Sequence, residues 1–76
     1  MSKLPVCSGR AALRVFERCG WIVHRERSSH ISMHKHGNPV LLVVPDHKEL
    51  DAGILRSLIR DSGITVEQFV ELLRDL

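Results

Sequence analysis

The residues best suited to chemistry are one histidine and two arginines on either side of a short polar break. Arg25 and Arg27 precede this Ser28-Ser29 break, and His30 follows it. If the break is a two-residue turn between antiparallel strands, Arg27 lies opposite His30 and all three side chains share one face. An imidazole that exchanges protons near neutral pH, beside guanidinium groups that bind phosphate, is equipped to cleave RNA through its 2′-OH. On spacing alone, a polar residue on an exposed strand face is the commoner interpretation of such a histidine.

The other histidines and the two cysteines lack the spacing of a metal site. Structural zinc usually takes paired Cys or His ligands two to four residues apart. Cys7 and Cys19 are distant in the chain, and His34 and His36 would lie at best at a strand end. We therefore expect no metal and no cofactor, exposed histidines, and free, partly buried thiols of the kind found in a reducing compartment.

Local patterns predict the elements that position these residues. Ser8 can cap a helix that ends at Gly20, and strand-like runs follow over 21–27, 30–35 and 40–44. A second helix precedes Gly63, and Thr65 with Gln68 forms a capping box for a third. The predicted fold is α+β, with a three-stranded antiparallel sheet that has helices on one face and nothing on the other. Trp21 is expected in the core.

Length and composition limit the function classes. With 76 residues, 43% apolar and 26% charged, the chain is one soluble domain over residues 1–76, too small for a Rossmann sheet or a TIM barrel. The longest apolar run, 40–44, is far shorter than the roughly 20 residues of a membrane span. The N-terminal residues contain no secretory h-region, so we expect a cytoplasmic protein.

The charge distribution favours an anionic partner of the N-terminal half. Residues 1–35 hold seven Lys or Arg and two acids, whereas residues 36–76 hold four and seven, so the halves carry +5 and −3. The last predicted helix exposes mostly acidic residues, including Glu67, Glu71 and Asp75, which is the wrong sign for a DNA groove. We therefore expect no direct DNA binding, and we interpret the last two helices as a packed hairpin.

Several short motifs along nearly the whole chain carry a family resemblance. They are Gly20-Trp21, Arg25, Ser29-His30, the segment Val44-Pro45-Asp46-His47-Lys48-Glu49-Leu50, the segment Gly53-Ile54-Leu55-Arg56-Ser57-Leu58-Ile59-Arg60, and Gly63-Ile64. With these motifs the sequence resembles the HicA mRNA interferase toxins of toxin–antitoxin modules. Two positions depart from the pattern: Ser28 stands where Gly is usual, which matters if the turn needs a positive φ there, and Ile54 stands where Thr is common.

The resemblance implies a double-stranded-RNA-binding-domain-like α-β-β-β-α fold, here with an additional short C-terminal helix. It also implies a type II toxin that cleaves mRNA without a metal and is neutralised by a HicB-type antitoxin. The histidine of the family's Gly-Ser-His motif corresponds to His30, the expected catalytic acid/base. Phosphate and RNA contacts are expected from the following residues: Arg25, Arg27, Ser29, Lys35 and Lys48. His47 is a candidate proton donor, and the alternative function is a non-catalytic RNA-binding module.

Overall fold

The computed structural model describes residues 3–76 and contains three helices and three strands within that range. In chain order the elements are α1 (Gly9–Arg18), β1 (Ile22–Arg27), β2 (His30–Lys35), β3 (Asn38–Pro45), α2 (Ala52–Ser62) and α3 (Val66–Arg74). The predicted α-β-β-β-α-α order and α+β class are confirmed. The third strand is longer than the apolar run that predicted it, because pairing with β2 extends it at both ends.

Local signals account for the ends of the helices. The Ser8 hydroxyl accepts a hydrogen bond from Ala11 N, which satisfies one of the unpaired donors at the start of α1. Gly63 ends α2 at a φ of 87°, a left-handed conformation that glycine adopts without strain. The Thr65–Gln68 capping box at the start of α3 is complete, with both of its hydrogen bonds formed.

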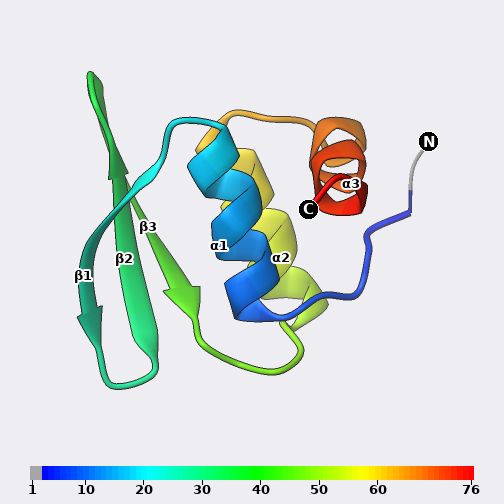
Figure 1. Ribbon diagram of the computed structural model, residues 1–76, viewed down its shortest axis with the longest axis horizontal. Helices are drawn as coiled ribbons and strands as arrows, with labels where there is room; N and C mark the ends of the chain where they lie inside the picture. Colours follow the sequence, from blue (N-terminus) through cyan, green and yellow to red (C-terminus); the bar gives the residue numbers. More distant parts are fainter. Residues whose placement is uncertain (1–2) are drawn as a thin grey trace.

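The sheet is an antiparallel meander with the order β1-β2-β3, and one of its faces is covered by helices. Figure 1 shows α1 and α2 packed side by side on that face and α3 on their far side, remote from the sheet. Alternate residues of β2 and β3 point into this layer, since Ile31, Met33, Leu42 and Val44 are at most 1% exposed. The opposite sheet face is left uncovered, as predicted.

The core lies between the sheet and the helices and continues to α3. Trp21 and Phe16 are essentially buried, and the rings of Phe16 in α1 and Phe69 in α3 lie 5.6 Å apart. α3 therefore packs on α1 as well as on α2, which confirms a packed helical arrangement. Among residues 3–76, no helix combines the length and apolarity needed to cross a membrane.

Candidate functional site

His30 is the first residue of β2, and its side chain belongs to the uncovered face of the sheet. Its neighbour Ile31 is fully buried against the helices, so strand alternation directs His30, Ser32 and His34 the other way. His30 is exposed and, within residues 3–76, makes no side-chain hydrogen bond or ion pair. The imidazole is therefore open to contact with a ligand on this face.

The register places both arginines beside this histidine. Arg27 pairs directly with His30, and Arg25 pairs with Ser32, as the sequence predicts. Directly opposed residues have Cβ atoms about 4.5–5.5 Å apart, and diagonal neighbours such as Arg25 and His30 about 7–8 Å. Neither guanidinium has an ion-pair partner among the described residues. One imidazole and two uncompensated positive charges thus share a small area of exposed sheet.

A β-bulge in β1 makes this arrangement possible. Val23 pairs with Met33 and Arg25 pairs with Ser32, so His24 is an extra residue between two paired ones. The bulge reverses the alternation, which lets Val23 face the helix layer while Arg25 and Arg27 face away from it. It was not predicted from the sequence.

Acidic residues near the site are held on the other side of the sheet. Glu26 pairs with the buried Ile31, so it faces the helices, where Arg10 of α1 contacts its carboxylate at 2.5 Å. The same guanidinium contacts Asp46, just after β3, at 3.1 Å. Arg10 donates both hydrogen bonds, and these bonds, the one to Asp46 first and the one to Glu26 second, raise the pKa of its guanidinium. Arg10 therefore neutralises two carboxylates on the helix side of the sheet, across from Arg25 and Arg27.

The turn that carries the site has an unusual backbone conformation. Ser28 has a φ of 53°, the positive value that was suspected from the missing glycine. In residues 3–76, Ser28 is the sole non-glycine residue with a positive φ, so Ser29 has a negative one. Two-residue hairpin loops that need a positive φ usually have glycine at that position, and here a serine occupies it.

The end of β3 and the loop after it complete this end of the sheet. Pro45 pairs with His30, and the Asp46 amide donates to the Ser29 carbonyl at 2.7 Å. The loop is fixed to the start of α1, since Gly9 N donates to His47 O at 2.9 Å. A Cβ on Gly9 would lie 1.9 Å from the Pro45 carbonyl oxygen, so only glycine fits there. His47 and Lys48 are exposed on this loop, close in sequence to the residue opposite His30.

Lys35 is not brought to the site. It is the last residue of β2, about 16 Å along the strand from His30, and its side chain lies beside Gly20 at the end of α1. His34 shares the uncovered face and forms an edge-on ring pair with His24, 5.3 Å between centroids. Its backbone is about 13 Å from that of His30, which is too far for both to contact one phosphate directly.

Residues 3–76 contain no group of three or more His, Cys, Asp or Glu side chains that could hold a metal ion. Cys7 and Cys19 are free thiols and half-buried, as expected. Burial raises the pKa of both, and nearby Lys35 partly offsets that effect at Cys19. Both groups are therefore less nucleophilic than an exposed cysteine.

A family model, the HicA toxin of bacterial toxin–antitoxin systems, matches residues 9–64. This chain belongs to the HicA toxin family. The match begins at the first residue of α1 and ends just after α2, so it includes the whole sheet and His30, and α3 lies outside it. No individual curated protein matches the sequence. HicA toxins pair with an antitoxin, so this chain is the toxin component of such a pair.

Proposed function

We propose that this HicA chain is an endoribonuclease that cleaves mRNA without a metal ion, with His30 as its catalytic acid/base. The observation that carries the proposal is the pairing of His30 with Arg27, with Arg25 on the diagonal, on the uncovered face of the sheet. Membership of a toxin family supports a harmful activity of this kind. We further propose that the protein acts in the cytoplasm, where its mRNA substrate is found.

The proposed reaction begins when His30 removes the proton from a ribose 2′-OH. The 2′ oxygen attacks the adjacent phosphorus, and the bond from phosphorus to the 5′ oxygen breaks, which leaves a 2′,3′-cyclic phosphate. The departing 5′ oxygen takes a proton from an acid, for which the exposed His47 is our candidate. Arg25 and Arg27 bind the phosphate and stabilise the charge that grows on its oxygens.

The remaining assigned residues extend RNA binding. Ser29 lies in the turn next to His30, and Lys48 lies in the loop at the same end of the sheet. We assign both to contacts with the sugar-phosphate backbone. Lys35 lies apart from them, and we assign it to a more distant nucleotide of a bound strand. The HicB-type antitoxin is the proposed partner that keeps this surface from RNA.

The test compares wild type with His30→Ala on a fluorescently labelled single-stranded RNA. Removal of a general acid/base should slow cleavage by about 10²- to 10⁴-fold, and mass spectrometry should detect a cyclic phosphate on the wild-type product. The matched control is His36→Ala, which removes an exposed histidine at the opposite end of the sheet and should leave the rate unchanged. Circular dichroism verifies that both variants fold.

Two results would contradict the proposal. Full activity of folded His30→Ala would remove His30 from the mechanism. RNA binding by a wild-type protein that never cleaves any RNA would favour the alternative, a non-catalytic RNA-binding module.

A further inference from the structure

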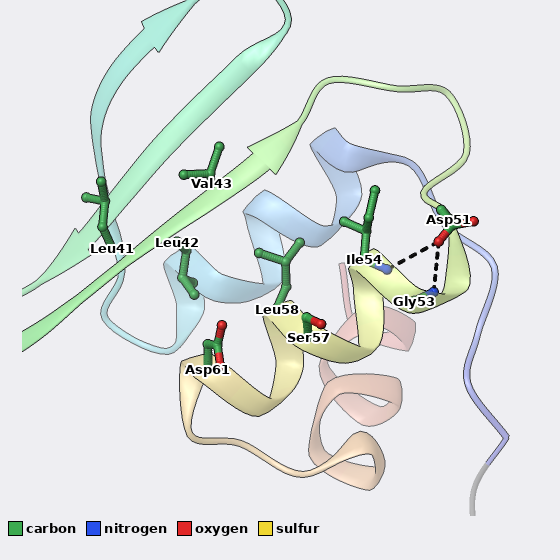
Figure 2. A pocket seen from close by; sticks show the side chains of 9 residues that line it. All are labelled: Leu41, Leu42, Val43, Asp51, Gly53, Ile54, Ser57, Leu58 and Asp61. Atoms are coloured by element: carbon green, nitrogen blue, oxygen red, sulfur yellow. Dashed lines mark hydrogen bonds between the residues drawn. The ribbon is translucent and has the colours of Figure 1, made fainter.

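An apolar groove runs between β3 and α2, at the edge of the sheet that β3 forms. It has a volume of about 500 Å³ and includes Leu41 and Val43 from β3 and Ile54 and Leu58 from α2. Figure 2 shows β3 and α2 running along its two sides. Leu41, Val43 and Ile54 are 52%, 44% and 37% exposed, so the chain leaves three large aliphatic side chains in water here.

One wall of this groove is an unprotected sheet edge. The Asp46 backbone N–H donates a hydrogen bond to the Ser29 carbonyl. Because every second residue of an antiparallel strand makes the backbone hydrogen bonds to its neighbour, Val44 and Leu42 also bond to β2. The N–H and C=O of Val43, which lies between them, therefore point to the free edge of the sheet. Residues 40–44 contain no charge, proline or glycine that would discourage a further strand. Both outer strands have an irregular register, at His24 in β1 and between Asn38 and Leu42 in β3, but the β1 edge has four consecutive polar residues, 24–27, where the β3 edge has the apolar run 40–44.

The two ends of the groove are acidic. Asp51 caps the start of α2, and Asp61 lies in its last turn, ten residues later, which corresponds to about 15 Å along the helix. The Asp61 carboxylate accepts one hydrogen bond, from the exposed Arg60 Nε at 3.3 Å, and a basic side chain in the groove would compete with that surface pair. Figure 2 shows Asp61 towards the Leu41 end and Asp51 at the other. An extended segment spans about 13 Å between its first and fifth residues, so basic side chains at those two positions reach both carboxylates.

We propose that an extended segment of the antitoxin adds to the edge of β3 as a fourth strand. Alternate side chains of that segment, basic, apolar and basic, face α2 and contact Asp61, Ile54 and Asp51. The carboxylates disfavour nucleic acid as the occupant, because they repel phosphate. They also disfavour a second copy of this chain, because symmetric pairing of two β3 edges would bring like charges together.

This inference rests on family membership and is independent of RNA cleavage. A strand bound at the β3 edge lies beside the uncovered face without occupying it. The remainder of the antitoxin is then free to cover His30 and the two arginines. The groove thus supplies a second contact that anchors the inhibitor next to the site.

The probe is a seven-residue peptide, capped at both termini, with threonine at positions 1, 3, 5 and 7 and lysine, valine and lysine at positions 2, 4 and 6. Its binding is followed by the amide NMR shifts of the wild-type protein. We expect saturable shifts in β3 and α2 and none in β1. Asp61→Arg should weaken binding about three- to tenfold, whereas Glu17→Arg, the same charge change on the exposed face of α1, should not. A peptide with glutamates in place of lysines should not bind.

Val43→Pro tests the backbone contact, because it removes only an outward-facing N–H and should leave the ladder to β2 intact. We expect it to abolish peptide binding while the RNA-cleavage rate stays at the wild-type value. If Val43→Pro unfolds the protein, Asp61→Arg decides the question. NMR shifts centred on β1, or equal binding of the glutamate peptide, would overturn the proposal. A wild-type dimer that Val43→Pro dissociates would also overturn it, because the β3 edge would then bind a second copy of this chain.

Discussion

Replacing Ser28 with glycine should stabilise the protein, because Ser28 holds a positive φ in the turn next to His30. Its φ of 53° is in the left-handed region, which costs an L-residue about 1–2 kcal/mol. Glycine avoids that strain but loses about 0.5–1 kcal/mol more in conformational entropy on folding. The difference predicts a net gain of about 0.5–1 kcal/mol in the free energy of unfolding for Ser28→Gly.

The measurement is urea and thermal denaturation, followed by circular dichroism. For a domain of this size, 1 kcal/mol corresponds to about 4–8 °C in Tm, so we expect an increase of about 2–8 °C. Ser29→Gly is the matched control, since Ser29 lies in the same turn with a negative φ. There glycine brings only the entropic cost, and stability should fall by about 0.5–1 kcal/mol.

The ranking of these two variants decides the argument. If Ser28→Gly is no more stable than Ser29→Gly, the backbone at Ser28 is unstrained, and the argument from its positive φ is wrong. The RNA-cleavage rate of Ser28→Gly should match that of wild type, because the Arg27–His30 pairing that closes the turn is unchanged.

Four further predictions concern chemistry, binding and packing. RNA cleavage should persist in EDTA, and activity that disappears with chelator and returns with a divalent ion would contradict a metal-independent mechanism. RNA and the antitoxin should compete for the inactive His30→Ala protein, and their simultaneous binding at full affinity would place the antitoxin elsewhere. Gly9→Ala should lower the free energy of unfolding by about 2–3 kcal/mol in urea titrations, because its Cβ would collide with the Pro45 carbonyl. Cys7 should react with iodoacetamide more slowly than a cysteine peptide at pH 8, because burial raises its pKa and keeps the thiol protonated; equal rates would contradict that burial.

Features that depend on neighbouring residues in the chain were predictable. The Ser8 cap, the capping box at Thr65 and the limits of β2 all follow from local chemistry, and the structure has each of them. The two-residue turn also set the Arg27–His30 pairing correctly, since a short turn fixes the register of the strands that it joins.

Features that depend on tertiary contacts were not predictable in this way. Arg10 bridges Glu26 and Asp46, which are distant from it in the chain, and no local pattern indicated this contact. Lys35 was expected to extend the basic surface around His30. The structure instead places its side chain beside Gly20, because the alternation along β2 directs it towards the helix layer.

The bulge at His24 is the one missed feature for which the sequence held a signal. Trp21 and Arg27 are six residues apart, so strict alternation in one strand would place both on the same face. The structure buries Trp21 to 1% exposure, even though its Nε1 has no hydrogen-bond partner among the described residues. An apolar ring in the core and a charged group on the open face therefore require one extra residue between them, and a bulge supplies it.

The same strand also explains why a chain with a net charge of only +2 can present a concentrated positive site. Residues 25–27 carry both signs, and alternation separates them: the two arginines face outward beside His30, and Glu26 faces inward to Arg10. Arg10→Ala would release both carboxylates that it now holds. Their negative charge, close to Arg25 and Arg27, would then oppose phosphate binding, so the local charge at the site depends on a residue of the opposite layer.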